Sequence, residues 1–280
     1  MLGLGNSICL STVTDSGYAA LHSWDFDGSD DHINLGQDSS IKPTTTNTSA
    51  GTGLSISLWV KKDDWNVTTA AGIFSCFQDS GGWGFRIGTR LTFDLRSASG
   101  TRTCQSNYKP FESASDVHYR SSGWQHFVAT FDGRYVKMYI NGALSSGTNT
   151  VDIGSDDNAI EYNTTSADKF TDVCIGMDPY RLTGGAGTAA IRDPFPGLIN
   201  EVAMWDKVLD ADAVEEIFEA VNTSGAVLDL TKDSGDYDYS DDLIGLWRGN
   251  EGSGTTAEDE GGSNDGTMKN SLAFSSTIPS

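Results

Sequence analysis

The centre of the sequence holds two runs of strand-forming residues, each followed by a two-residue turn signal. Residues 124–131 (WQHFVATF) and 135–140 (YVKMYI) are rich in aromatic and β-branched side chains. Asp132-Gly133 and Asn141-Gly142 follow them, and both dipeptides favour the tight turns of β-hairpins. The sequence therefore predicts an antiparallel meander here, which restricts the chain to folds that contain antiparallel sheets.

Similar runs recur on both sides of this meander. Residues 55–60 (SISLWV) alternate with period two and place Ile56, Leu58 and Val60 on one face of a strand. Further runs lie at residues 73–77, 83–87, 91–96, 173–176, 198–205, 243–248 and 266–269. The 32 glycines of the 280 residues supply the turns between them. We expect an all-β, two-sheet antiparallel jelly-roll sandwich.

One segment departs from this pattern and predicts a short helix. Its apolar residues are spaced three and four apart, at Val214, Ile217, Phe218 and Val221. Asp210 is placed to cap its N-terminus, and Gly225 is placed to end it. A single helix among so many strands is expected to be an appendage of the sandwich.

Composition divides the chain into three parts. Residues 1–20 are rich in glycine and serine and predict an N-terminal arm that becomes ordered on a partner. Residues 21–270 form the predicted jelly roll, of which 229–270 are an acidic closing segment, and 271–280 are a predicted C-terminal tail.

The formal net charge of −21 argues against binding to nucleic acid or to an anionic membrane surface. Two explanations of this acidity stay open: solubility, or carboxylates that collect a divalent cation. The four cysteines (Cys9, Cys76, Cys104 and Cys174) have no metal-ligand spacing. We expect buried thiols, with a Cys76–Cys104 disulfide as the alternative.

Four motifs, in order along residues 24–225, resemble those of concanavalin A-like, laminin-G-like jelly rolls. They are FDGSDDHI at 26–33, SISLWV at 55–60, the hairpin at 124–142, and FPGLINEVAMW at 195–205 with the following helix. A fifth motif, residues 246–267, is similar to a segment that precedes the FDG motif in many members of this family. Its position here implies a circularly permuted closure, in which the last strands lie beside the first ones.

The chain opens with a short leader, residues 1–6 (MLGLGN). A permuted jelly roll that begins in this way resembles virion structural proteins of tailed bacteriophages. The first residues have no basic segment followed by an apolar run, so no secretory signal is predicted. The resemblance implies assembly in a host cytoplasm and a location on the virion. The alternative location is extracellular.

Catalysis is not expected. The glucanases of the resembled superfamily carry their carboxylates on one strand as Glu-x-Asp-x-x-Glu, and no such run occurs here. Glu201 and Asp206 are five residues apart and would point to opposite faces of a strand. The four histidines form no metal-binding pattern, and no GxSxG sequence is present.

Structural Ca²⁺ is the expected cofactor, since hard cations prefer carboxylate and carbonyl oxygens from turns. The resemblance implies a site near the glycine-rich loop of residues 250–266. The predicted ligands are Asp259, Asn264 and Asp265, with a second cluster at Asp27, Asp30 and Asp31 and with Glu201 completing either set. The alternative explanation is that Asp and Asn before Gly are turn formers.

Carbohydrate binding would use exposed aromatic rings for stacking and polar side chains for hydrogen bonds. The candidates close to predicted loops are Trp65, Trp83, Tyr108 and Tyr180, beside Asp63, Asp64, Asp79 and Asp178. The alternative is that these aromatic residues belong to the core or its rim.

These observations predict a non-catalytic virion structural or appendage protein, such as a fibre, decoration or tail component. Its expected partners are other virion proteins, further copies of itself (a trimer would suit a fibre) and cell-surface glycans. A calcium-dependent carbohydrate-binding lectin module is the alternative, and a glycoside hydrolase is a more distant one.

Overall fold

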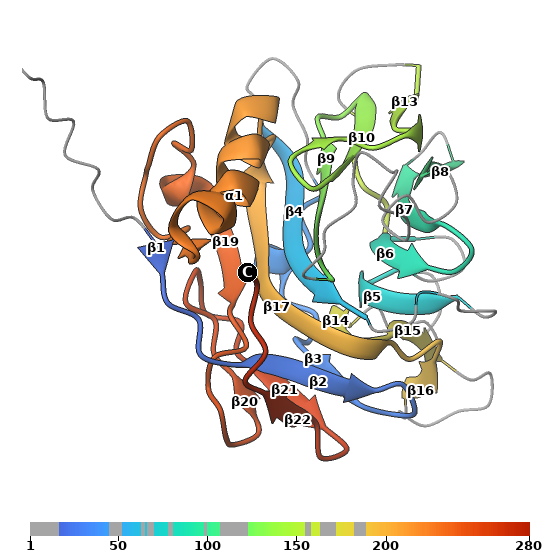
Figure 1. Ribbon diagram of the computed structural model, residues 1–280. Helices are drawn as coiled ribbons and strands as arrows, with labels where there is room; N and C mark the ends of the chain where they lie inside the picture. Colours follow the sequence, from blue (N-terminus) through green and yellow to red (C-terminus); the bar gives the residue numbers. More distant parts are fainter. Residues whose placement is uncertain are drawn as a thin grey trace, which may run out of the picture.

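The computed structural model describes residues 17–44, 52–62, 65, 70–77, 81–97, 100–106, 123–154, 158–162, 172–181 and 189–280. They form two nine-stranded sheets packed face to face, in which every strand pair is antiparallel (Figure 1). The predicted two-sheet, concanavalin A-like sandwich with one helix is confirmed.

The first sheet follows the order β11 (Ala143–Leu144), β10 (Tyr135–Ile140), β9 (Trp124–Phe131), β4 (Thr52–Lys61), β17 (Pro196–Lys207), β2 (Ser23–Asp27) and β22 (Ala273–Ser275). In addition, β13 (Thr150–Asp152) pairs with β10, and β19 (Leu243–Trp247) pairs with β17.

The second sheet follows the order β12 (Gly147–Thr148), β8 (Gly100–Ser106), β7 (Leu91–Ser97), β6 (Trp83–Ile87), β5 (Ala71–Ser75), β14 (Cys174–Ile175), β3 (His32–Asn34), β21 (Gly266–Lys269) and β20 (Thr256–Ala257). Two short pairs lie outside the main sheets: β1 (Gly17–Tyr18) with β18 (Val227–Leu228), and β15 (Asp178–Arg181) with β16 (Ala189–Arg192). The helical segments are α1 (Ala211–Ser224), η1 (Ser39–Ile41) and η2 (Ser240–Asp242).

The central meander forms as its turn residues predict. Strands β9 and β10 pair across the Asp132-Gly133 turn, where the Asp132 carboxylate accepts hydrogen bonds from the backbone N–H groups of Arg134 and Tyr135. Asn141 and Gly142 both have positive φ, which the tight turn into β11 requires.

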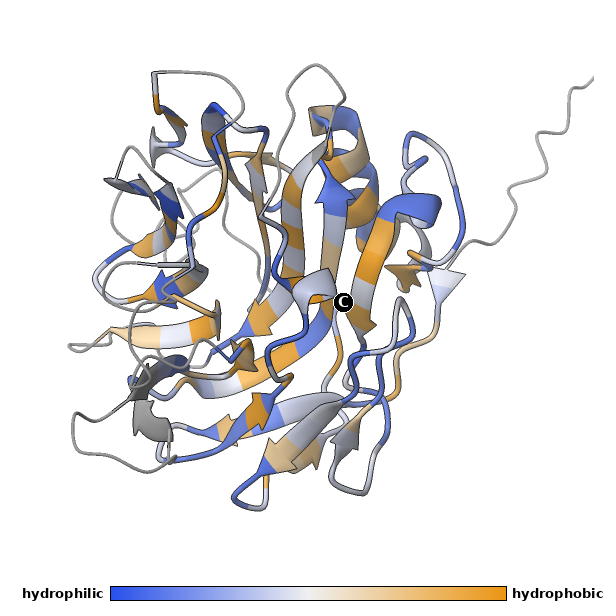
Figure 2. Cartoon of the chain, turned by 180° about the vertical axis from the view of Figure 1, so that it is seen from behind, coloured by the Kyte–Doolittle hydropathy of each residue, from blue (hydrophilic) through white to orange (hydrophobic). Residues whose placement is uncertain are grey.

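The main core fills the space between the sheets. Ile56, Leu58 and Val60 of β4 all belong to it and are fully buried. Figure 2 shows the alternation of hydrophobic and hydrophilic residues along the strands that produces this inner face. All seven tryptophans of the chain are buried, none being more than 7% exposed.

Helix α1 covers the outer face of the first sheet. The Asp210 carboxylate accepts a hydrogen bond from the N–H of Ala213, and Gly225 ends the helix in the left-handed conformation. Val214 and Ile217 pack with Trp205 of β17 in a second hydrophobic cluster. Within the described residues, no helix is long and apolar enough to cross a membrane.

The two ends of the chain close the sandwich together. Strand β21 pairs with β3, and β22 pairs with β2, so the last strands lie beside the first ones, as the permuted motif order implies (Figure 1). Asn250 adds to this closure, because its side-chain oxygen accepts hydrogen bonds from the N–H groups of Leu21 and His22.

The predicted domain boundaries are wrong at both ends. Residues 271–280 are not a tail, because β22 adds a strand to the first sheet and Leu272 is buried in the core. Part of the predicted arm also belongs to the fold: Tyr18 pairs with Val227, and Ala20 is buried. Residues 1–16 lie outside the described residues.

Three of the cysteines are described, and all are buried free thiols. The alternative of a Cys76–Cys104 disulfide is therefore wrong. Burial raises the pKa of both thiols to about 12, so they behave as small apolar residues. Cys9 lies outside the described residues.

Candidate functional site

The outer face of the second sheet presents polar side chains, whereas α1 and the segment after it cover the first sheet. Along β6 and β7, residues such as Phe85 and Phe93 point into the core, so the alternate residues Arg86 and Thr92 point outward. Arg86 lies opposite Thr92, which lies opposite Gln105 of β8. The sheet register thus produces a polar row across three strands.

A pocket of about 270 Å³ lies over this row. It is lined by Ala70, Arg86, Gly88, Thr89, Arg90, Thr92 and Gln105. The tight turn from β6 to β7 forms one wall, with the N–H of Gly88 donating to the carbonyl of Arg90. An Nη of Arg90 donates to the side-chain oxygen of Gln105 at 3.0 Å, which holds both groups at the pocket.

Arg86 also joins the pocket to three carboxylates outside its lining. Its Nε lies 2.6 Å from the Asp178 carboxylate, and its two Nη atoms lie 3.3 Å from Asp193 and 4.0 Å from Asp94. The Arg86 side chain is 25% exposed, so it contacts these partners and still reaches the pocket. We call these four residues the Arg86 cluster.

Two members of the cluster mark the base of the β15–β16 hairpin. Asp178 begins β15 and Asp193 follows β16, so Arg86 fastens both ends of the hairpin to β6. Gly72 of β5 permits this close approach, because a Cβ there would lie 2.2 Å from the backbone nitrogen of Asp178. Its N–H donates to the carbonyl of Asp193.

Burial changes the acidity of the cluster. It raises the pKa of Asp178 to about 6, and the Arg86 charge only partly opposes this shift. Burial also raises the pKa of Asp94, against a hydrogen bond that the hydroxyl of Thr103 donates to its carboxylate. Both groups therefore take up a proton in milder acid than exposed aspartates do.

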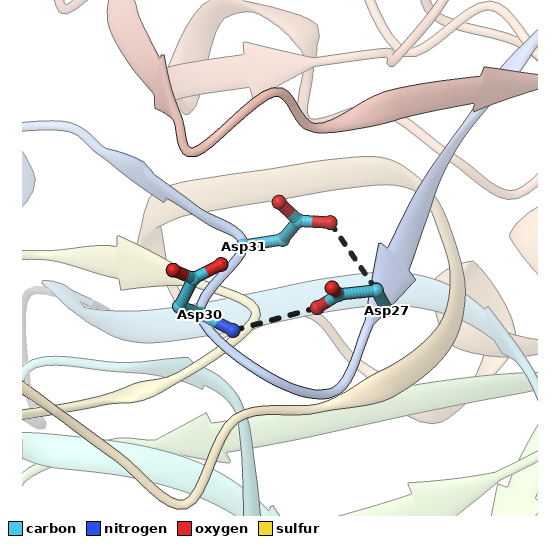
Figure 3. Close-up of side chains that lie close together, drawn as sticks. All are labelled: Asp27, Asp30 and Asp31. Carbon is cyan, nitrogen blue, oxygen red and sulfur yellow. Dashed lines mark hydrogen bonds between the residues drawn. The ribbon is translucent and has the colours of Figure 1, made fainter.

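A second candidate site is the turn between β2 and β3, where Asp27, Asp30 and Asp31 lie together (Figure 3). One carboxylate oxygen from each lies within 4.8 Å of the others. Asp27 accepts hydrogen bonds from the N–H groups of Ser29 and Asp30, and Asp31 accepts one from the N–H of Asp27. The three carboxylates are close enough to share one cation.

The predicted calcium loop is built differently. Both carboxylate oxygens of Asp259 accept hydrogen bonds, one from the N–H groups of Leu246 and Gly261 and the other from Asn264. Asp265 accepts a hydrogen bond from the N–H of Asp259. These hydrogen bonds hold the Asp259 side chain in the turn, but a carboxylate oxygen can accept a hydrogen bond and also bind a cation, so its role as the leading calcium ligand stays a prediction.

Glu201 forms a buried ion pair with Arg248. It is 2% exposed in β17, and its carboxylate lies 2.9 Å from an Nη of Arg248. Arg248 also contacts Asp229 at 2.9 Å and Glu260 at 2.7 Å, and its guanidinium stacks on the ring of Tyr18 at 3.7 Å. Arg248 thus contacts one carboxylate oxygen of Glu201, which is not part of the Asp27, Asp30 and Asp31 cluster, and a role for Glu201 as a calcium ligand stays a prediction.

The described tryptophans among the predicted sugar-stacking residues are buried. Trp65 and Trp83 are 7% and 0% exposed, so neither ring offers a face to a ligand and the prediction is wrong at both positions. Tyr180 lies in β15, but its side chain is outside the described part, as is Tyr108 altogether. Asp178 does lie near the candidate site, as a partner of Arg86.

Sequence reasoning missed the pocket. Arg86, Thr92 and Gln105 occupy outward positions of successive strands, which their alternation with core residues indicates. Which of these outward residues lie side by side depends on strand register, and register is not visible in the alternation alone.

The two-sheet antiparallel sandwich with one helix defines a concanavalin A-like fold. The model of the concanavalin A-like lectin/glucanases superfamily matches residues 27–215, and the chain belongs to this family. A search of curated proteins gave no match.

Among solved structures, the chain is similar to a protein of Bacteroides ovatus provisionally named as carbohydrate-binding, with 15% identity and a TM-score of 0.54. The similarity covers 92% of this chain and 60% of that one. A heptameric SAP-like pentraxin of Limulus polyphemus matches at 14% identity over 74% of this chain and 83% of its own, with a TM-score of 0.45. At these identities the likeness shows the fold alone.

Proposed function

We propose that this chain is a non-catalytic carbohydrate-binding domain whose ligand site is the pocket over β6, β7 and β8. The observation that carries the proposal is the pocket lining. Its side-chain donors and acceptors come from two arginines, two threonines and one glutamine, on three adjacent strands and on the turn between β6 and β7. Guanidinium and amide groups donate hydrogen bonds to hydroxyl oxygens, and amide and hydroxyl oxygens accept hydrogen bonds from sugar hydroxyls.

The size of the pocket favours a small ligand. Its volume of about 270 Å³ lies just below the roughly 300–1,000 Å³ of sites for drug-sized ligands, so we expect it to hold a single sugar ring. Because none of the described residues that line the pocket is aromatic, hydrogen bonds are expected to dominate the binding. The provisional name of the Bacteroides ovatus protein agrees with this class of ligand.

The absence of catalysis is part of the proposal. The pocket lining that the structure describes includes no carboxylate, and hydrolysis by the common mechanism requires two. Of the nearby carboxylates, Asp178 and Asp193 are ion-paired with Arg86. We expect no turnover of a polysaccharide panel, and release of reducing ends would contradict this part of the proposal.

A glycan array followed by titration calorimetry tests the binding function. We expect a hit that Gly88→Leu abolishes, because the new side chain would occupy the pocket. A Cβ at Gly88 meets Ala70 at 3.7 Å, an ordinary contact, so the fold should tolerate the change. Thr101→Val, on β8 outside the pocket lining, is the control and should bind like wild type. A sugar bound equally well by Gly88→Leu would contradict the proposed site.

We further propose that Asp27, Asp30 and Asp31 hold a Ca²⁺ ion that stabilises the β2–β3 turn. Three carboxylates within 4.8 Å supply part of the six to eight oxygens that Ca²⁺ prefers, and solvent would supply others. Calorimetry with CaCl₂ should show one site that Asp30→Asn weakens, whereas Asp236→Asn, an exposed control, should leave it unchanged. Equal calcium affinity in both variants would contradict this site.

The virion assignment, the trimer and the location on a particle remain predictions that none of these findings tests. Light scattering of the purified protein tests the assembly prediction. A discrete oligomer is expected for a fibre component, and a monomer would contradict that role.

A further inference from the structure

The charges around the pocket do not match the charges inside it. Among the described residues that line the pocket, the charged ones are Arg86 and Arg90, and none is acidic. Directly behind the lining, however, three carboxylates surround Arg86 at 2.6 to 4.0 Å. The pocket and its immediate support therefore combine two positive charges with three negative ones, in a chain whose net charge is −21.

This charge balance determines whether Arg86 acts toward a ligand as a positive charge or as a hydrogen-bond donor. Its Nε and one Nη face Asp178 and Asp193, which offset its charge, while the guanidinium keeps its ability to donate hydrogen bonds. A hydroxyl oxygen can accept such a bond without altering the charge balance. A ligand carboxylate would instead add a fourth negative charge beside three that are already present.

We propose that the pocket selects neutral sugars over uronic acids, and that Asp178 and Asp193 set this preference by offsetting the charge of Arg86. The inference rests on the proposed carbohydrate-binding function of the same pocket. It makes the two aspartates specificity-determining residues that act through Arg86 rather than by touching the ligand, which is discrimination by repulsion of the wrong ligand.

The test uses sugars that differ only at C6. Calorimetry compares glucose with glucuronate, galactose with galacturonate, and mannose with mannuronate, for wild type and for Asp193→Asn. Asp193 is the better choice for substitution, since its side chain is 25% exposed and that of Asp178 only 7%. The control is Asp152→Asn, which removes the partner of Arg134 on the first sheet.

We expect wild type to bind the preferred hexose about tenfold more tightly than its uronic acid, the effect of one like-charge contact of modest strength. Asp193→Asn should reduce this ratio about fivefold or more, and Asp152→Asn should leave it unchanged. A uronic acid that binds wild type as tightly as the hexose would overturn the inference, as would an unchanged ratio in Asp193→Asn. Failure of every sugar to bind would instead overturn the proposed function itself.

The pH dependence of the affinity of the wild-type protein for the uronic acid, relative to the hexose, provides a second test. Asp178 faces Arg86, Asp94 and Asp193, with Cys174 also close by, and burial raises its pKa to about 6. Lowering the pH from about 7.5 to about 5.5 therefore removes negative charge behind the pocket while the uronate stays ionised. The affinity for the uronic acid should rise several-fold over this range relative to the hexose. A ratio that stays constant or falls would count against the inference.

Discussion

Two arginines of this molecule each pair with three carboxylates, but one is buried and the other is partly exposed. Arg248 and Arg86 each gather three carboxylates, but their side chains are 2% and 25% exposed. The Arg248 guanidinium is enclosed by its partners and by the ring of Tyr18, so its role is structural. Arg86 keeps an exposed portion at the pocket, so the same type of ion pairing leaves it able to contact a ligand.

Replacing Arg248 with methionine should destabilise the protein strongly. The change leaves the side chains of Glu201 and Asp229, which are 3% and 11% exposed, without the guanidinium that donates hydrogen bonds to them, and an unsatisfied buried polar group costs about 1–3 kcal/mol, more where it is charged. Arg134→Met removes an exposed, solvent-screened pair with Asp152 and should destabilise the protein much less. Chemical denaturation measures both free energies of unfolding, and equal losses would show that the Arg248 cluster is not the stronger support.

The stability of the protein should also fall as the pH rises toward 8. Burial raises the pKa of Glu201 to about 8, so the folded state binds more protons than the unfolded state above the ordinary value of 4.5. The contribution of Glu201 is therefore complete below about 4.5 and is lost as the pH rises through about 8. Denaturation between about pH 5 and 8 should show a steeper decline in wild type than in Glu201→Gln. Parallel curves would exclude this residue as the cause.

At the scale of secondary structure, close backbone approach positions the site. The β15–β16 hairpin reaches β5 at Gly72, and this contact brings Asp178 and Asp193 to Arg86. The β6–β7 turn, in contrast, leaves free space at Gly88 for the pocket. Gly72 on β5 thus allows close contact with the hairpin, whereas Gly88 in the β6–β7 turn leaves room for a ligand.

Alanine substitution at Gly72 and at Gly88 tests the two roles separately. Gly72→Ala places a Cβ 2.2 Å from the Asp178 backbone and should cost about 1–3 kcal/mol while loosening the hairpin. Gly88→Ala meets only ordinary contacts and should change stability by less than about 0.5 kcal/mol. Thermal denaturation combined with proteolysis within residues 178–193 compares the two variants. Equal protease resistance would mean that Gly72 does not control docking of the hairpin.

Local elements could be predicted from the sequence, whereas the site could not. The Asp132-Gly133 turn and the α1 caps at Asp210 and Gly225 depend on neighbouring residues, and all three form as expected. The Arg86 cluster combines residues from β6, β7 and the hairpin that are more than 100 positions apart at the extremes. Register and hairpin docking bring them together, and neither leaves a local signal. At the Asp259 loop, turn formers and calcium ligands share the same residue types, so the sequence does not separate the two roles.

At the scale of the whole molecule, the C-terminal strands complete both sheets. Strand β22 covers β2 at one edge of the first sheet, and β21 pairs with β3 in the second. The N-terminal segment is therefore held by the last part of the chain, through these ladders and through Asn250.

Truncation tests this closure. Ending the chain after Lys269 removes β22 and Leu272, which exposes the edge of β2 and part of the core. We expect a lower melting temperature and a tendency to aggregate, because an unpaired strand edge is a template for association. Ending the chain after Ser276 retains β22 and should have a much smaller effect. A truncation at Lys269 that is as stable as the full chain would show that β22 is dispensable.

The central claim is that the pocket over β6, β7 and β8 is the carbohydrate site, and amide chemical-shift mapping tests it most directly. The neutral sugar that binds best is titrated into isotope-labelled protein. We predict that the largest shifts occur at Gly88, Thr89, Arg90, Thr92 and Gln105, which belong to the pocket lining. Shifts confined to other surfaces, such as the turn at Asp27–Asp31, or no shifts at saturating sugar, would contradict the claim.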